Sequence, residues 1–185
     1  YYLGVKKRIA NLEHHTLFFD EDLTQHAKEI YKNPVWPSKP LFYVCCPSKT
    51  DTTIAPEGHE NLFILCPVPD LRYKPDWSDS EELAKTIIKD LSERVGYDIS
   101  SNIVTQTILS PVEWQNNFNL YRGSGLGLAH GLNQIGGFRP ANKDEKLSNL
   151  YYVGASTIPG TGLPIVVIGS RLVTERILQD HGTIH

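Results

Sequence analysis

The chain has 185 residues, of which 40% are hydrophobic and 21% charged, and its formal net charge is −3. These values are typical of a globular protein with one sizeable core, and the scattered Lys and Arg residues give no indication of nucleic-acid binding. No apolar run approaches the roughly 18 residues of a membrane-spanning helix, so we expect any membrane association of this chain to be peripheral.

Two strands, over residues 1–8 and 16–19, are predicted at the beginning of the chain, with His14 and His15 between them. Neighbouring side chains of a strand point to opposite faces. We therefore expect the two histidines to make a poor bidentate metal site, and one of them to hydrogen-bond at the sheet edge. A short helix follows over residues 20–31, with acidic residues at its start and lysines near its end, as the helix dipole favours.

Two uninterrupted apolar runs, residues 41–46 and 61–66, predict buried strands that pair in an antiparallel way across the loop between them. That loop contains Asp51, Glu57 and His59, side-chain types from which an acid/base cluster can be built. We favour the simpler interpretation, in which these side chains solvate the loop and cap its turns.

The cysteines are Cys45, Cys46 and Cys66. An odd number without CxxC spacing indicates neither a disulfide framework nor a zinc site. We therefore expect buried structural thiols and no metal.

A helix is predicted over residues 81–96, with Ser78 as its N-terminal cap. Its apolar residues recur at helical spacing, which is typical of an amphipathic helix packed on a sheet. They are Leu83, Ile87, Ile88, Leu91 and Val95. A strand over residues 103–109 and a further helix follow, and the helix starts at Ser110 with Pro111 in its first position.

Residues 121–137 contain six glycines and show no periodicity, so this segment can make tight turns and approach a ligand closely. A surface loop is the alternative. Arg139, just beyond it, could contact an anion or a carboxamide, or form a salt bridge.

For the last part of the chain, the sequence predicts a short strand over residues 150–153, a glycine-containing loop, and a helix that ends near Gly182. The glycines of this loop are Gly154, Gly160 and Gly162. A strand that leads through such a turn into a helix can bring backbone N–H groups against an anion or a polar cofactor. Pro164 is tolerated in the first helical turn. The alternative is a connection in which glycine only turns the chain.

Residues 149–164 read Asn-Leu-Tyr-Tyr-Val-Gly-Ala-Ser-Thr-Ile-Pro-Gly-Thr-Gly-Leu-Pro. This segment closely resembles the C-terminal signature of bacterial-type and fungal phytoene desaturases, which are FAD-dependent enzymes of the amine-oxidase-like flavoprotein superfamily. Further resemblances follow in the same order over residues 10–17, 48–58, 65–69 and 110–140. Two positions depart from the pattern: Ile158 stands where the family usually has His, and Ser156 where the superfamily often has an acidic residue that holds the ribityl chain.

The resemblance implies an α/β (α+β) protein that is part of a two-domain flavoprotein. Residues 1–110 would belong to the substrate-binding domain, with a mixed or antiparallel sheet and helices. Residues 111–185 would return into the Rossmann-like FAD-binding domain and supply its C-terminal strand and helix. No GxGxxG unit follows a strand near the start, where this superfamily carries it, and the sequence has no Met. We therefore expect the C-terminal part of a longer chain.

By the same resemblance the cofactor is FAD, with NAD(P) the less expected electron acceptor. The residues that would approach the pyrophosphate and ribityl groups are Gly154, Ala155, Ser156 and Thr157. Those under the isoalloxazine ring would be Gly160, Gly162, Leu163, Pro164, Ile165 and Val166. No catalytic side chain is assigned, since a flavin supplies the redox chemistry itself.

The implied reaction is desaturation of phytoene to more conjugated carotenoids such as lycopene. The expected partners are an apolar C40 polyene and an intracellular membrane surface, with which the protein would associate peripherally. Whether the chain forms a homo-oligomer is left open. Three alternatives remain: another amine-oxidase-like flavin oxidoreductase, a retinol-saturase-like protein, and a non-catalytic homologue that binds apolar lipid.

Overall fold

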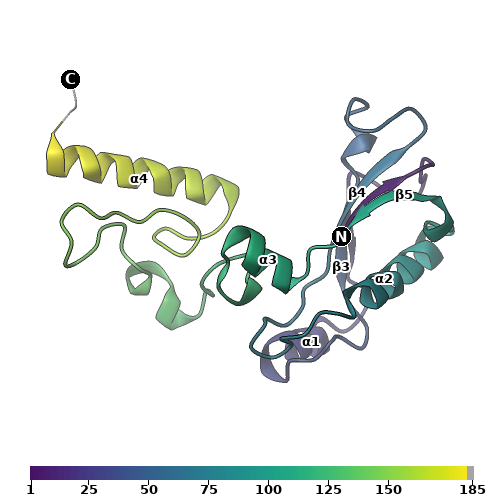
Figure 1. Ribbon diagram of the computed structural model, residues 1–185, viewed down its shortest axis with the longest axis horizontal. Helices are drawn as coiled ribbons and strands as arrows, with labels where there is room; N and C mark the ends of the chain where they lie inside the picture. The colour runs from purple at the N-terminus through teal and green to yellow at the C-terminus, as the bar shows by residue number, and fades with distance from the viewer. Residues whose placement is uncertain (183–185) are drawn as a thin grey trace. The chain divides into compact units, whose positions relative to one another are not determined.

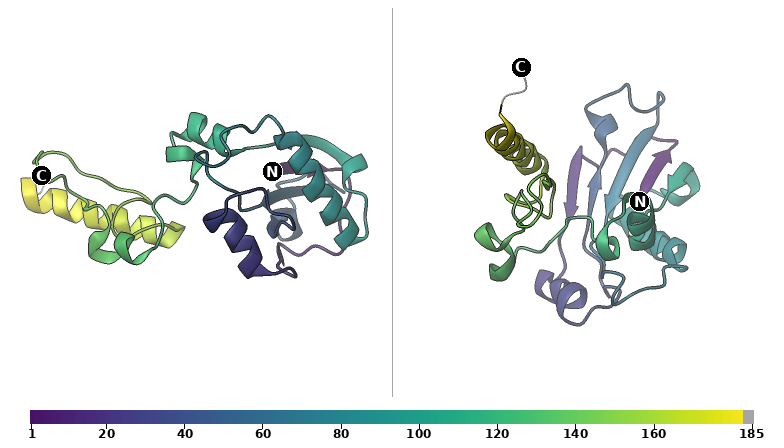
Figure 2. Two further views of the ribbon diagram at one scale, coloured as in Figure 1. Left: turned by 90° about the horizontal axis from the view of Figure 1, so that it is seen from below. Right: turned by 60° about the vertical axis from the view of Figure 1, so that its left-hand side comes forward.

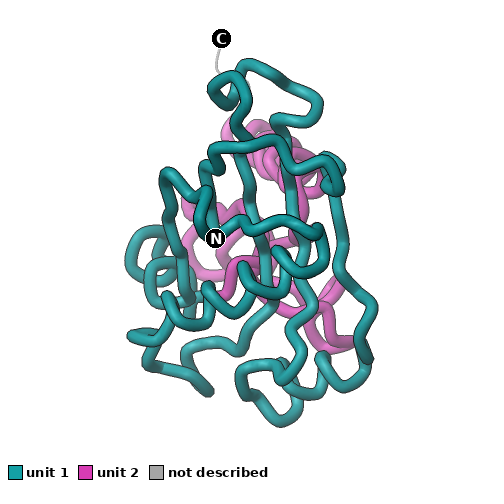
Figure 3. The backbone as a smooth tube through the Cα atoms, turned by 90° about the vertical axis from the view of Figure 1, so that its right-hand side faces the viewer, with its two compact units in different colours: residues 1–123 teal, residues 124–185 magenta. Residues whose placement is uncertain are grey.

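The computed structural model describes residues 1–182, and the chain divides into two compact units. Unit 1 comprises Tyr1–Gly123, and unit 2 begins at Ser124 (Figure 3). The boundary predicted after residue 110 separates a substrate-binding part from an FAD-binding part. Because it concerns function, it stays a prediction.

Unit 1 is built on the antiparallel sheet drawn in Figure 1. It has five strands in the spatial order β2-β3-β4-β1-β5. The strands are β1 (Tyr2–Val5), β2 (His15–Phe18), β3 (Phe42–Cys45), β4 (Glu60–Leu65) and β5 (Ile103–Thr107). Together with the helices this sheet confirms the predicted mixed class. The predicted antiparallel pairing of the two apolar runs is also confirmed, because Val44 of β3 lies opposite Ile64 of β4.

One face of the sheet carries the core, because alternate residues of each strand point to the same side. The strand residues buried on this side are Leu3, Val5, Phe42, Val44, Leu62 and Ile64. Helix α2 (Ser80–Val95) packs against them through four residues of the predicted apolar stripe, Ile87, Ile88, Leu91 and Val95. The helix ends as predicted at Gly96, whose φ of +66° suits a left-handed C-cap.

The N-terminal cap predicted for α2 is wrong. The residue at the cap position is Asp79, and its side chain makes no capping hydrogen bond. Ser78 instead donates from its N–H and its hydroxyl to the carboxylate of Asp76. The side chain of Ser78 is therefore used in the turn that precedes the helix.

Helix α1 (Leu23–Ala27) starts later than predicted and continues into a π-helical turn, Lys28–Lys32. Asp22 sets this start, because its carboxylate accepts hydrogen bonds from the N–H groups of Thr24 and Gln25.

Helix α3 (Pro111–Phe118) begins as predicted, with Ser110 as its cap and Pro111 at its first position. Glu113 completes a capping box by accepting from the N–H of Ser110. Short 3₁₀ turns complete the described helices: Pro47–Lys49, Ser100–Asn102, Tyr121–Gly123, Leu132–Gln134 and Gly136–Phe138.

Unit 2 contains the longest helix, α4 (Leu163–His181), beside irregular segments that run along it (Figure 2). Its end at Gly182 agrees with the sequence. The strand predicted over residues 150–153 is wrong: within the described part of this unit, Tyr151 makes only an isolated bridge to Lys143. The hydrogen bonds from the N–H of Tyr152 to the carbonyl of Asn142 and from the N–H of Asp144 to the carbonyl of Leu150 belong to this bridge.

Among residues 1–182, none of the helices has both the length and the apolar character needed to cross a lipid bilayer.

Candidate functional site

The loop that precedes α4 has a backbone only glycine adopts readily. The φ angles are +134° at Gly154, +140° at Gly160 and +109° at Gly162. A side chain at any of these positions would strain the backbone. The loop also contains a cis peptide bond between Ile158 and Pro159.

Arg139 holds this loop from inside unit 2, and its side chain is only 3% exposed. Its guanidinium donates to the carbonyl oxygens of Ala155 at 2.7 Å and Thr157 at 3.2 Å. The other three hydrogen bonds go to the carbonyl oxygens of Leu128, Ala129 and Gln134. A guanidinium has five N–H donors, so these bonds use its full capacity. The predicted contact with an anion or carboxamide and the alternative salt bridge are therefore both wrong.

Asn142 adds a second internal link to the loop. Its Nδ2 atom donates to the carbonyl oxygens of Ile158 at 2.8 Å and Tyr152 at 3.2 Å. Thr157 is buried, and its hydroxyl donates to the carbonyl of Gly154 at 3.0 Å. Its side chain thus stabilises the loop and is turned away from solvent.

The glycine-rich segment approaches the same loop closely at Gly127. A Cβ atom on Gly127 would lie 2.8 Å from Ser156 Oγ and 3.2 Å from the carbonyl carbon of Ala155. The close approach that glycine permits in this segment is therefore an approach to the chain itself.

The start of α4 is open to solvent and carries no side-chain cap. Gly162 occupies the cap position, and its carbonyl accepts from the N–H of Val166 at 2.9 Å. Leu163 is 84% exposed and Ser156 is also exposed. First-turn N–H groups have no partner within a helix, and the helix dipole adds positive charge there. This exposed end fits a polar, anionic part of a cofactor.

The predicted cofactor residues are thus contiguous in unit 2 but differ in exposure. Thr157 and Gly160 are buried, Gly154, Ala155 and Val166 are half-buried, and Ser156, Gly162, Leu163, Pro164 and Ile165 are exposed. The exposed members are thus Ser156 in the loop and four residues at the start of α4.

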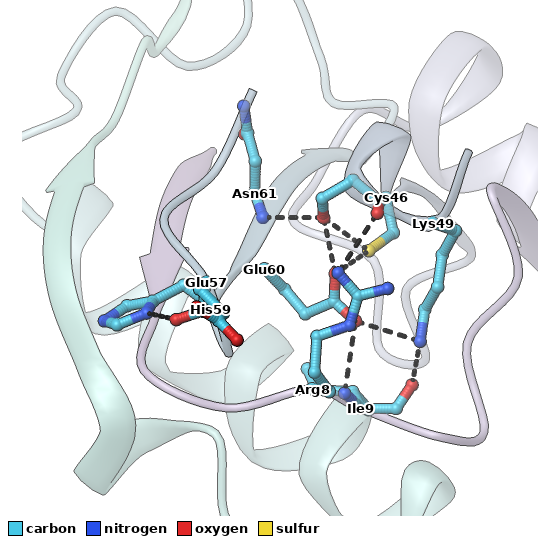
Figure 4. Close-up of polar contacts among 9 residues, drawn as sticks. Arg8, Ile9, Cys46, Lys49, Glu57, His59, Glu60 and Asn61 are labelled. Atoms are coloured by element: carbon cyan, nitrogen blue, oxygen red, sulfur yellow. Dashed lines mark hydrogen bonds and ion pairs between the residues drawn. The ribbon is translucent and has the colours of Figure 1, made fainter. Parts of the chain in front are cut away.

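A second polar cluster, in unit 1, centres on Glu60, which is 1% exposed (Figure 4). Its carboxylate lies 2.9 Å from Lys49 Nζ and 3.3 Å from Arg8 Nε. It also accepts hydrogen bonds from the Ser48 hydroxyl and from the Cys46 thiol. The cluster joins the end of β1 to the turn that follows β3.

The Glu60 cluster is arranged for stability. Burial acts to raise the pKa of the Glu60 carboxyl, but hydrogen bonds from Ser48, Lys49 and Cys46 outweigh it and lower that pKa. Burial raises the pKa of the Cys46 thiol to about 11. A carboxylate that stays ionised beside a thiol that stays protonated offers no proton exchange near neutral pH.

Glu60 is not among the residues predicted from the sequence, although the strand period places it on the inward side of β4. The nearby residues considered as an acid/base cluster, Asp51, Glu57 and His59, bond within their own loop, and Figure 4 draws the bond between His59 and Glu57. His59 Nδ1 lies 2.8 Å from the carbonyl of Glu57, and Asp51 accepts from Thr53.

The outer face of the sheet, opposite the core, carries a row of aromatic rings across four strands. Ring centroids are 5.1 Å apart for Tyr2 and Phe63, 6.2 Å for Phe63 and Tyr43, and 5.9 Å for Tyr43 and His15. A groove of about 410 Å³ adjoins the row between Tyr2 and the exposed Val104. Unit 1 therefore presents an extended apolar surface.

The predicted separation of His14 and His15 is wrong, because their ring centroids lie 4.2 Å apart. Strand β2 begins only at His15, and His14 lies in the bend before it. The alternation of a strand therefore does not apply to this pair.

No profile of a known protein family matches the chain. It is 42% identical to a zeta-carotene-forming phytoene desaturase of Myxococcus xanthus, in an alignment that covers 96% of this chain and 34% of that protein. It is 35% identical to a carotenoid 3,4-desaturase of Haloarcula japonica, over 97% of this chain and 36% of that protein. It is 34% identical to a phytoene desaturase of Fusarium fujikuroi, over 98% of this chain and 36% of that protein.

The chain thus spans about a third of the length of the curated relatives it matches: 34% of the first and 36% of each of the other two. The matches extend over nearly all of its own residues, including the loop before α4 and the Glu60 cluster. By sequence, the chain is similar to phytoene and carotenoid desaturases over nearly its whole length.

Proposed function

We propose that the chain is the C-terminal third of an FAD-dependent desaturase that introduces double bonds into an apolar C40 polyene such as phytoene. The identity of 42% to a zeta-carotene-forming phytoene desaturase, over 96% of the chain, carries this proposal. Bound FAD would accept the two hydrogens removed from a saturated carbon pair. In this assignment residues 1–110 belong to the substrate domain and residues 111–185 to the FAD domain.

The open start of α4 and the loop before it are the proposed flavin contacts. Main-chain N–H groups at the first turn of α4 would donate to the cofactor, and the helix dipole would stabilise negative charge on it. Ser156 is exposed and would offer its hydroxyl to the ribityl chain. Thr157 would contribute its backbone only, since its hydroxyl donates to Gly154.

Arg139 is the proposed positioning residue of this site. It binds the carbonyl oxygens of Ala155 and Thr157 on the loop. Because its donors are all used inside unit 2, it would fix the loop's shape without touching the cofactor.

The aromatic row on the outer face of the sheet is the proposed wall for the polyene. A conjugated hydrocarbon offers no polar handle, so only apolar and aromatic surface can hold it. Tyr2, Phe63 and Tyr43 supply this surface in a continuous line. Because a C40 polyene partitions into lipid, the proposal includes a peripheral membrane surface as its source.

The test uses the complete protein and the substitution Gly162→Asp. An aspartate here adds bulk and negative charge where flavin would lie, so bound FAD should fall at least ten-fold. Gly182→Asp is the matched control, because it places the same residue at another positive-φ glycine, at the far end of α4. Flavin absorbance of the purified proteins measures the result. Stoichiometric FAD in Gly162→Asp would overturn the flavin placement.

Phytoene supplied to the unmodified complete protein tests the reaction itself. Coloured, more conjugated product supports desaturation. Retention of phytoene without product would support the lipid-binding alternative, and bound FAD without phytoene turnover would support another oxidoreductase of the superfamily.

A further inference from the structure

Three potential metal ligands meet at one edge of the sheet in unit 1. A ring nitrogen from each of His14 and His15 and the Sγ atom of Cys45 all lie within 4.8 Å of one another. Strand pairing brings them together, because His15 of the edge strand β2 lies directly opposite Cys45 of β3. The bend at His14 turns the second imidazole toward the first.

Each imidazole is held by a hydroxyl group at its Nδ1 atom. His14 Nδ1 lies 2.7 Å from Thr50 Oγ1, and His15 Nδ1 lies 2.6 Å from the Tyr43 hydroxyl. Neither Nε2 atom has a hydrogen-bond partner among the residues that the structure describes. A ligating histidine normally has its second nitrogen fixed in this way by an outer partner. The arrangement therefore leaves one nitrogen of each ring free to coordinate.

We propose that His14, His15 and Cys45 bind a divalent ion of borderline softness, with Zn²⁺ as the reference case. Two imidazoles and one thiolate are a ligand set that Zn²⁺ takes in proteins, with water in the fourth position. Binding replaces the proton of the Cys45 thiol by a metal–sulfur bond and releases that proton to solvent.

Metal binding would require the imidazole rings to turn within the site. Zinc–nitrogen and zinc–sulfur bonds of about 2.1 and 2.3 Å place tetrahedral ligand atoms about 3.5 Å apart. Since one nitrogen of each ring already lies within 4.8 Å of Cys45 Sγ, rotation of the side chains would bring the Nε2 atoms to the bonding separation. His14 and Cys45 are half-buried and His15 is exposed, so their side chains can rotate. The bound ion would clip the start of β2 to β3.

The experiment titrates the full chain with Co²⁺, which takes the same geometry as Zn²⁺ and is visible in the absorption spectrum. One equivalent should produce a thiolate-to-cobalt charge-transfer band in the near ultraviolet, and Zn²⁺ should displace it. Cys45→Ser should abolish the band, and His15→Ala should weaken Co²⁺ binding at least ten-fold. Zn²⁺ should also raise the Tm of the unmodified chain and leave that of Cys45→Ser unchanged.

Two variants outside the cluster serve as matched controls. Cys66→Ser removes another free thiol, and His59→Ala removes an imidazole whose Nδ1 bonds a backbone carbonyl. Both should keep the band and the Zn²⁺-dependent rise in Tm. Circular dichroism verifies that each variant is folded, and Cys45→Ser is nearly isosteric. No charge-transfer band in the unmodified chain, or a band that persists in folded Cys45→Ser, would overturn the site.

Discussion

The Nη2 atom of Arg139 donates a 2.7 Å hydrogen bond to the carbonyl oxygen of Ala155. This bond joins the segment after the six glycines to the loop before α4. Four further bonds from the same guanidinium go to other carbonyl oxygens of unit 2. A single buried cation therefore organises the backbone that the proposed flavin site requires.

Replacing Arg139 with Lys should loosen this loop, because an ammonium has three donors and cannot reproduce the planar five-donor pattern. We expect a loss of about 3 kcal/mol in the stability of unit 2, and faster amide exchange over residues 154–162. Hydrogen exchange measured by mass spectrometry gives the result. Arg171→Lys, at an exposed pair with Glu175, is the control and should change little. Unchanged exchange in Arg139→Lys would contradict the role.

Gly127→Ala should displace the loop, because the added Cβ would meet Ser156 Oγ at 2.8 Å. Gly136→Ala is matched, since both glycines have positive φ, +72° and +53°, but nothing lies within 4 Å of a Cβ at Gly136. The strain of the backbone is thus common to both, and the difference in Tm isolates the contact. We expect the lower Tm for Gly127→Ala. Equal Tm values would show that Ser156 moves away without cost.

Glu60→Gln should destabilise unit 1 by about 3 kcal/mol, because it leaves the largely buried Lys49 ammonium, and the more exposed Arg8, beside a neutral group. Urea unfolding at neutral pH measures the loss. Glu82→Gln, whose partner Lys85 is exposed, is the control and should have little effect. If both substitutions had the same effect, the Glu60 cluster would not stabilise the fold.

The same carboxyl predicts a pH dependence. The pKa of Glu60 is lower in the folded chain than in the unfolded chain, so the unfolded state binds more protons between the two pKa values. Stability from Glu60 is complete above the unfolded pKa, about 4.3, and is lost as the pH falls through the folded pKa. Urea unfolding of the unmodified chain between neutral pH and pH 3 should show this loss, and Glu60→Gln should show less of it.

Ser110→Ala should cost about 1 kcal/mol, because it removes the capping bond to the N–H of Val112 and the hydroxyl bond to Glu113. Ser80→Ala is the control, at the first residue of α2. Thermal unfolding compares the two. An equal shift in Tm for both would argue against the capping box.

Local signals in the sequence predicted much of this fold. The start of α3 at Ser110, the apolar stripe of α2 and the end of α4 at Gly182 each depend on residues within a few positions. The prediction of a strand over residues 150–153 was wrong, because an apolar run becomes a strand only if another strand pairs with it. Here Tyr151 finds a single bridge partner, Lys143.

The polar clusters were beyond sequence reasoning because their partners are distant in the chain. Glu60 accepts from the N–H of Ile9, which is 51 residues away. Arg139 reaches back 11 residues to Leu128 and forward 18 to Thr157. His14 and Cys45 meet only through the pairing of β2 with β3. Neither composition nor periodicity specifies such contacts.

The close approach of Gly127 to Ser156 also means that the residue type tolerated at one of these positions depends on the residue at the other. A larger side chain at position 156, such as the acidic residue common in the wider superfamily, has space only while position 127 lacks a Cβ atom. These two positions should therefore covary among homologous sequences. A larger side chain at position 156 should occur only where position 127 is glycine.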